Sequence, residues 1–182
     1  MPIELRPYDH HSAAGRRTRA LYRAAFPPAE RPPFFLLRRH ARRDGVAFYT
    51  VHDGDTWVGF TYVIASDTLA YVFFLAMDPA ARGRGYGSAV LAALRERYAG
   101  RCLFLAVERL DEEDAPNRAE RLRRQAFYEK NGFHLLPGKL REGRVVYDLM
   151  GTGEPPTREG HRALMDAYLG PLFRRLIRIE LL

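Results

Sequence analysis

Along the first half of the chain, the spacing of hydrophobic positions changes between the alternation typical of strands and the three-to-four-residue spacing typical of helices. A short alternating segment opens the chain and is followed by apolar residues at helical spacing, which end before Pro27-Pro28. Later runs are apolar and rich in β-branched and aromatic residues, and the turn Asp53-Gly54-Asp55 between two of them indicates a hairpin. We therefore predict strands over 3–7, 46–51, 57–64 and 69–77, and helices over 13–25 and 35–43.

The second half of the chain continues the alternation of strands and helices. A glycine-rich turn at 82–87 opens a helix, and Asn131-Gly132 is a strong stop for another. We predict strands over 102–107, 133–136 and 145–150, a helix over 118–130, and two helical pieces after 157 broken at Gly170-Pro171. This order predicts a mixed sheet with helices on its faces, an α/β or α+β fold.

The chain reads as one domain with an appendage. Its 182 residues suit a single domain, and 151–156 is the only candidate boundary. We predict a main domain over 1–150 and a helical extension of it over 151–182. The last eleven residues are apolar enough to cover a sheet edge or a partner, so a homodimer is a hypothesis.

Composition restricts the class of protein. No apolar run approaches the roughly 20 residues of a membrane helix, and the acid-containing N-terminus is not a secretory signal. A single cysteine, Cys102, gives no disulfide framework, so we expect a cytoplasmic protein. The net charge of +7 could attract a phosphorylated ligand or nucleic acid, although the arginine runs at 38–43 and 174–178 are interpreted as solvated helix faces.

The turn Arg82–Ser88 is the strongest chemical signal. Its alternating glycines let backbone approach a ligand without Cβ clashes, and the first amides of the following helix favour an anion. No lysine completes a phosphate-binding Walker loop, and a dinucleotide fingerprint would need a glycine at Ser88. A phosphate site is therefore predicted, with a flexible turn as the alternative.

Two segments resemble a known family. Leu75-Ala76-Met77-Asp78-Pro79 followed by Arg82-x-x-Gly85-x-Gly87 resembles the acetyl-CoA motif of GNAT-type N-acetyltransferases. Phe127-Tyr128-Glu129-Lys130-Asn131-Gly132-Phe133 is similar to a second signature of that family, and the element order resembles its fold over about residues 1–150. The proline-rich loop around Glu30-Arg31 is more loosely similar to a bacterial subgroup of unassigned substrate.

The resemblance implies an acetyl-CoA site without a metal. The pantetheine arm would pair with the strand backbone at Leu75, Ala76 and Met77, one amide of which would polarise the thioester carbonyl. The pyrophosphate would lie on backbone amides and gain charge-assisted contacts from Arg82. These amides belong to Gly83, Arg84, Gly85, Tyr86, Gly87 and Ser88.

The resemblance also implies catalytic roles. Tyr128 matches the family's general acid, and Glu108, at the end of a strand, is the candidate base, with a water chain as the alternative. Helical spacing puts Arg121, Arg124 and Tyr128 on one face, opposite a core stripe of Ala119, Leu122 and Ala126. The family's CoA-contacting asparagine position holds Arg121 here, and Asn117 is interpreted as a helix cap.

The acceptor is less defined. Glu30 and Arg31 lie where the family builds its acceptor pocket, and the acidic run 111–114 could attract a cation, although solvated loops explain both. The favoured function is acetyl transfer from acetyl-CoA to a primary amine of a small molecule, peptide or protein. A catalytically weak acyl-CoA-binding module and a nucleic-acid-binding protein are the alternatives.

Overall fold

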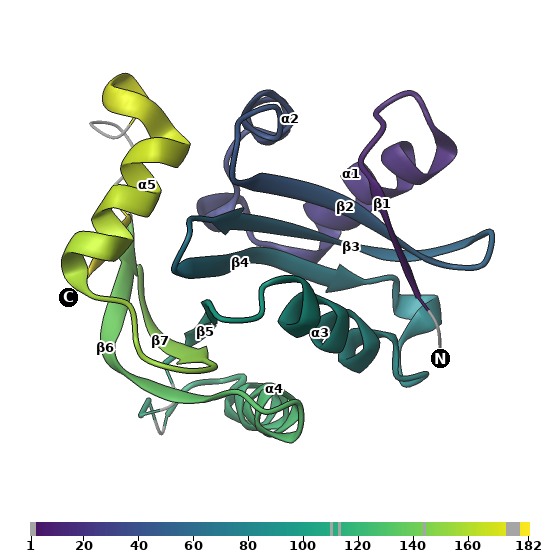
Figure 1. The fold of residues 1–182 in the computed structure, drawn as a ribbon. Coiled ribbons are helices and arrows are strands. Elements are labelled where there is room, and N and C mark those ends of the chain that lie inside the picture. Colours follow the sequence, from purple (N-terminus) through teal and green to yellow (C-terminus); the bar gives the residue numbers. More distant parts are fainter. Residues whose placement is uncertain (1–2, 110, 113, 144, 174–178) are drawn as a thin grey trace. The chain divides into compact units, whose positions relative to one another are not determined.

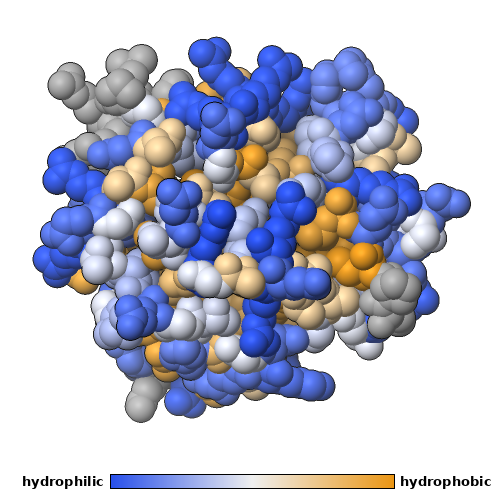
Figure 2. All heavy atoms as spheres, viewed as in Figure 1, coloured by the Kyte–Doolittle hydropathy of each residue, from blue (hydrophilic) through white to orange (hydrophobic). Residues whose placement is uncertain are grey.

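The computed structural model of the chain describes residues 3–109, 111–112, 114–143, 145–173 and 179–182. Contacts divide the chain into two compact units, Met1–Ile64 with Val72–Arg97, and Ala65–Tyr71 with Tyr98–Leu182. Figure 2 shows hydrophilic residues over much of the viewed face, with smaller apolar areas between them. Within the described ranges, no helix is both long and apolar enough to cross a bilayer.

The first unit is built on four strands in the order β1-β2-β3-β4 (Figure 1). The strands are β1 (Glu4–Pro7), β2 (Val46–Asp53), β3 (Thr56–Ala65) and β4 (Leu69–Met77), of which Leu69–Tyr71 count with the second unit. The helices are α1 (Ala13–Ala25), α2 (Phe34–His40) and α3 (Tyr86–Arg97), and 3₁₀ turns cover Pro28–Glu30 and Pro79–Ala81. The predicted strands and α1 are thus confirmed, whereas α2 ends at His40 because the chain turns there, rather than at Arg43.

Alternation along β2 gives the four strands two different faces. Phe48 packs its ring against Phe34 and Phe60, on the side of α1 and α2. The next residue, Tyr49, lies under the guanidinium of Arg97 from α3, on the other side. Successive side chains of a strand point to opposite faces, so α1 and α2 cover one face and α3 covers the other.

The second unit extends from the start of β4. Leu69, Ala70 and Tyr71 pair in parallel with Cys102, Leu103 and Phe104 of β5 (Cys102–Glu108). The order then runs β5-β7-β6-β8, all antiparallel, with β6 (His134–Glu142), β7 (Val145–Gly151) and β8 (Ile179–Leu181). Helices α4 (Arg118–Lys130) and α5 (Arg158–Phe173) belong to this unit.

The end of the chain differs from the prediction of two helical pieces. Gly170 leaves helical geometry at φ 73°, where the break was predicted. After it, Ile179–Leu181 form a strand that pairs with β6 rather than a helix. The prediction that the apolar tail covers a sheet edge is therefore confirmed for these three residues, and the arginine run 174–178 lies outside the described residues. Strand β6 is longer than predicted because a register shift between Leu136 and Lys139 lets it continue past Pro137-Gly138.

Helix α4 presents its polar side inward, which corrects the predicted core stripe. Ala119, Leu122 and Ala126 are exposed, Leu122 at 42%. The side chain of Arg121, in contrast, is only 14% exposed. Ion pairs to β5, described below, explain the inversion, because they satisfy charges that would otherwise be costly to bury.

Candidate functional site

The glycine turn between β4 and α3 has the shape of an anion cradle. Gly83 and Gly85 adopt positive φ, 74° and 83°, and a Cβ built on either would meet nothing within 4 Å. The first helical bond runs from Ala89 N to Gly85 O at 3.1 Å, so the amides of the preceding helical residues are the unsatisfied donors of a first turn. Open space, positive dipole and free approach of the backbone together fit a pyrophosphate.

Contacts within the first unit hold this turn on both sides. The Tyr86 hydroxyl donates to Asp53 Oδ2 of β2 at 2.6 Å. Asp78 accepts from Ala80 N at 3.0 Å and from Arg17 Nη2 of α1 at 3.1 Å. Arg82 and Arg84 remain exposed, with Arg84 over the Tyr86 ring at 5.5 Å. The backbone of the turn is therefore fixed while two guanidiniums are available beside it.

The last residues of β4 offer backbone for pairing with a ligand. The register of β5 on β4 covers Leu69, Ala70 and Tyr71, so among the described residues no strand is paired with the outer edge of Leu75–Met77, where backbone N–H and C=O groups can meet a ligand. On its inner side Gly59 of β3 packs so closely that an added Cβ would collide with Ala76 O and Met77 Cε. The segment Leu75–Met77 is thus set firmly against β3 and open on its other edge.

A charged cluster joins β5 to α4 in the second unit. Glu108 Oε1 accepts from Asn117 Nδ2, and Glu108 Oε2 accepts from Arg124 Nη1, both at 2.7 Å. Arg121 donates through Nε to Asn117 Oδ1 at 2.8 Å and through Nη1 to Glu112 Oε2 at 2.7 Å. Both carboxylate oxygens of Glu108 are therefore engaged, and the cluster ties α4 to the strand end.

Asn117 has a role that differs from the predicted one. It stands at the N-cap of α4, but its side chain makes no cap hydrogen bond. It instead bridges Glu108 and Arg121. Sequence reasoning missed this connection because β5 and α4 are brought together only by the fold.

Tyr128 lies near the end of α4, half-buried between aromatic neighbours. Its ring centroid is 5.2 Å from that of Phe127 and 6.0 Å from that of Phe133. Burial raises the pKa of Tyr128 above its ordinary value, and the nearby Arg124 charge opposes this rise. The phenol therefore stays protonated at neutral pH, as a proton donor must.

Comparison with known proteins assigns these features to a family. The family model described as "Acetyltransferase (GNAT) domain" matches residues 44–135, about half of the chain, including the glycine turn and Tyr128. The chain belongs to the GNAT acetyltransferase family. No curated protein matches this GNAT chain.

Solved structures agree on the fold. A GNAT-family protein from Bacteroides thetaiotaomicron has 25% identity and a TM-score of 0.72, covering 97% of this chain and 98% of its own. An aminoglycoside 6'-N-acetyltransferase complexed with coenzyme A has 18% identity and a TM-score of 0.61, covering 86% and 99%. The ribosomal-protein-S18-alanine N-acetyltransferase from Escherichia coli has 19% identity and a TM-score of 0.58, covering 83% and 93%.

The predicted site residues of this GNAT protein fall into two groups. Leu75–Met77 and Arg82–Ser88 lie together in the first unit, whereas Glu108 and Tyr128 lie in the second. Glu30 and Arg31 follow α1, where Arg31 Nη1 donates to Arg23 O at 2.6 Å and so holds a carbonyl at the helix end. A substrate role for this pair stays a prediction.

Two acids of the run 111–114 form ion pairs within the second unit. Asp111 binds Arg109 at 2.9 Å and Lys139 at 3.3 Å, and these contacts lower its pKa to about 2. Glu112 pairs with Arg121, and Glu113 lies outside the described residues. In the part of the chain that the structure describes, no group of three or more metal-ligating side chains gathers.

Proposed function

We propose that this GNAT protein transfers the acetyl group of acetyl-CoA to a primary amine of a small molecule, peptide or protein. The observation that carries this proposal is the glycine turn, with two positive-φ glycines facing open space at the start of α3. Family membership supplies the acetyltransferase class. The turn would hold the pyrophosphate, and the edge of β4 at Leu75–Met77 would pair with the pantetheine arm.

The reaction is a direct attack on a thioester. The acceptor ammonium first loses a proton, and the neutral nitrogen attacks the carbonyl carbon. The C–N bond forms, the C–S bond breaks and the nitrogen releases its second proton to water, so the acetyl group leaves CoA as an amide and the sulfur departs as a thiolate. A backbone amide of β4 stabilises the negative charge on the carbonyl oxygen as it develops.

Tyr128 is proposed as the acid that protonates the departing thiolate. Its burial keeps the phenol neutral until the sulfur needs a proton. General acid catalysis of this kind contributes about 10²–10⁴-fold to a rate. The helix that carries Tyr128 is tied to β5 by Arg124 and Glu108 at 2.7 Å.

Glu108 is proposed as the base, directly or through water. A carboxylate has about four lone-pair positions, and the contacts with Asn117 and Arg124 leave some of them available. The same engagement supports a second candidate function, an acyl-CoA-binding module with weak turnover, because both oxygens of Glu108 already hold contacts that an acceptor amine would have to share.

Thermal unfolding with and without acetyl-CoA tests the proposal first. At a ligand concentration of 100 Kd, binding adds about 2.7 kcal/mol to stability, a rise of roughly 5–10 °C in Tm for a chain of this size. Acetate alone should give no rise. Absence of a shift with acetyl-CoA for the folded protein would refute both candidate functions.

Thiol release then separates the two functions. A panel of primary amines, including polyamines, aminoglycosides and peptides with free N-termini, is added to protein and acetyl-CoA. Release of CoA that depends on one amine class supports the acetyltransferase. A thermal shift without release above the rate of spontaneous hydrolysis for every amine supports the binding module.

A further inference from the structure

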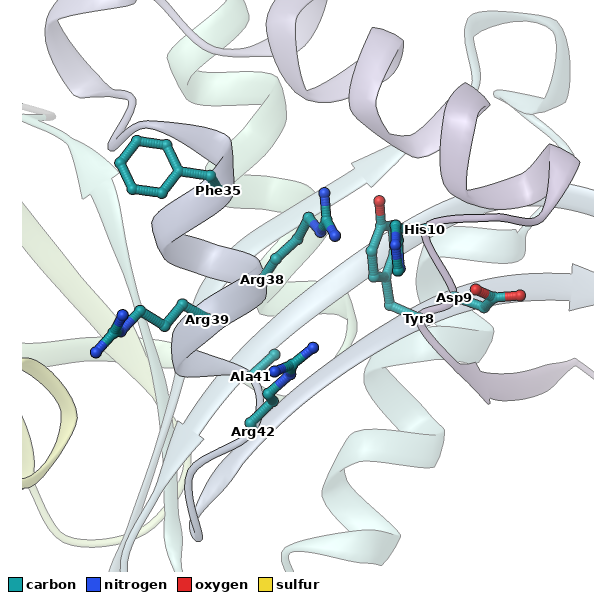
Figure 3. A pocket seen from close by; sticks show the side chains of 8 residues that line it. All are labelled: Tyr8, Asp9, His10, Phe35, Arg38, Arg39, Ala41 and Arg42. Carbon is teal, nitrogen blue, oxygen red and sulfur yellow. The ribbon is translucent and has the colours of Figure 1, made fainter.

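A pocket outside the proposed acetyl-CoA site opens between α2 and the segment after β1. Its volume is about 490 Å³, within the range of small-molecule sites. Tyr8, His10, Phe35, Arg38, Arg39 and Arg42 line it, together with Asp9 and Ala41 (Figure 3). All of these residues belong to the first unit.

The strand register places this pocket away from the glycine turn. Leu5 pairs with Val51, which pairs with Gly59, and Gly59 packs on Ala76 and Met77 just before the turn. The Tyr8 amide instead donates to Phe48 O, which precedes Val51 by three residues in β2. At about 3.3 Å per residue, the Phe48 position lies roughly 10 Å from the Val51 position, towards the end of the strands that is further from the glycine turn. The pocket is therefore a separate feature of the unit.

Two guanidiniums point to the same side of the pocket. Arg38 lies in the last turn of α2 and Arg42 in the turn that follows, and Figure 3 shows both directed towards Tyr8 and His10, whereas Arg39 points the other way. In the described part of the chain, none of the three forms an ion pair with a carboxylate. A pair of unneutralised arginines facing one hollow favours an anion.

The acid that lines the pocket does not offset these charges. Asp9 accepts from His11 N through Oδ1 at 2.9 Å. Figure 3 shows its carboxylate directed away from Arg38 and Arg42. The helix end itself favours cations in its last turn, which explains why arginines are tolerated there. It does not explain why two of them converge on a hollow with aromatic walls.

The walls across from the arginines are aromatic. The Tyr8 ring stacks on Phe48 with centroids 4.1 Å apart and planes 3° apart, and it meets Phe34 edge-on. His10 packs against His11 at 3.6 Å between centroids. Its pKa is lowered by local desolvation and then by the charges of Arg38 and His11, against the opposing charge of Asp9, and the imidazole can donate a hydrogen bond. Phe35, at the rim, is 64% exposed.

We propose that this pocket binds a small phosphate monoester that carries an aromatic or apolar group. Arg38 and Arg42 would grip the phosphate, because the planar fork of a guanidinium matches two phosphate oxygens at once. His10 would donate a further hydrogen bond. The exposed ring of Phe35 would cover the apolar part of the ligand and so leave water on binding.

The test follows the His10 ring by NMR while phenyl phosphate is added to the full chain. Sodium chloride at matched ionic strength is the control for screening, and inorganic phosphate measures the part of the affinity owed to the anion alone. His10 is a local reporter, so phosphate captured at the glycine turn leaves its signal unmoved. The assignment comes from the spectrum of His10→Gln.

Two double variants separate the pocket from the overall charge. R38Q/R42Q removes the converging arginines, and R118Q/R123Q removes two exposed arginines from α4. We expect a saturable shift of His10 with phenyl phosphate, weakened at least about tenfold in R38Q/R42Q and unchanged in R118Q/R123Q. Inorganic phosphate should bind more weakly than phenyl phosphate.

Several results would overturn the proposal. They are a His10 signal that moves no more than with chloride, equal losses in both double variants, and no preference for phenyl phosphate over inorganic phosphate. Saturable binding of an acidic peptide without binding of phenyl phosphate would assign the pocket to a protein partner instead. Because acetyl-CoA binding is measured separately, these outcomes are independent of the proposed acetyl transfer.

Discussion

Gly85→Ala is the sharpest perturbation of the proposed pyrophosphate site, because the chain supplies a matched control. Gly85 and Gly100 have nearly the same φ, 83° and 82°, and each faces space with nothing within 4 Å of an added Cβ. Gly100 follows α3 and carries no proposed ligand contact. The two alanine variants therefore place the same strain and the same methyl group at two positions of different proposed function.

The expected cost in stability is the same for both variants. A left-handed conformation of a residue with a Cβ lowers the free energy of unfolding by about 1–2 kcal/mol. Alanine also lowers the conformational entropy of the unfolded chain, which raises the free energy of unfolding by about 0.4–1 kcal/mol. A net loss near 1 kcal/mol lowers Tm by about 2–4 °C in a chain of this size. Thermal unfolding followed by circular dichroism, without ligand, measures this loss.

The expected cost in binding differs. At Gly85 the methyl group occupies the space through which the pyrophosphate would reach the backbone amides. Loss of one charge-assisted hydrogen bond costs about 1.5–3 kcal/mol, which raises the Kd for acetyl-CoA by about 10–150-fold. Isothermal titration of acetyl-CoA into Gly85→Ala, Gly100→Ala and the unchanged protein measures it. Equal Kd values for acetyl-CoA in the two variants and the unchanged protein would refute the proposed pyrophosphate site and leave the glycines with the role of a simple turn.

Three further predictions concern proton transfer and stability. Tyr128→Phe should lower kcat by about 10²–10⁴-fold and leave the Kd for acetyl-CoA within about twofold; an unchanged kcat would remove the tyrosine from the chemistry. Glu108→Gln should lower kcat/KM, while the control Glu112→Gln keeps it; loss of stability with an unaltered kcat/KM would make Glu108 a positioning residue rather than the base. Burial lowers the pKa of His161 to about 4 in the folded protein, whereas the same imidazole has a pKa near 6.5 in the unfolded chain. Between these two pH values the unfolded chain therefore binds a proton that the folded protein does not. Stability should therefore be lost as pH falls from about 6.5 to about 4, by about 3 kcal/mol at most, and His161→Phe should flatten this part of a denaturation series; an identical slope would exclude His161 as its cause.

The sequence predicted best where local patterns decide structure. The bounds of α1, α4 and the 69–77 strand agree with the prediction, because caps, prolines and Asn131-Gly132 mark their ends. The strand Ile179–Leu181 was mistaken for helix, since its structure depends on pairing with the distant β6. A three-residue strand has no periodicity long enough to distinguish the two.

The inward face of α4 shows where pattern reasoning fails. Helical spacing defined two faces correctly, and the rule that apolar residues lie inside selected the wrong one. The inversion depends on Glu108, nine residues before Asn117 in the chain, whose carboxylate draws Arg121 and Arg124 towards β5. The pocket beside α2 was missed for a similar reason, because only the fold brings Tyr8 and His10 opposite Arg38.

The buried state of Cys102 has a practical consequence for labelling. It is the only cysteine of the chain, it is 7% exposed, and burial raises its pKa to about 11. At pH 8 about one thiol in a thousand is then ionised, and only the thiolate reacts with disulfide reagents and maleimides. The unaltered protein should therefore give almost no background with such reagents. A single cysteine introduced at an exposed position would accept a fluorophore or spin label selectively, without prior removal of a native thiol.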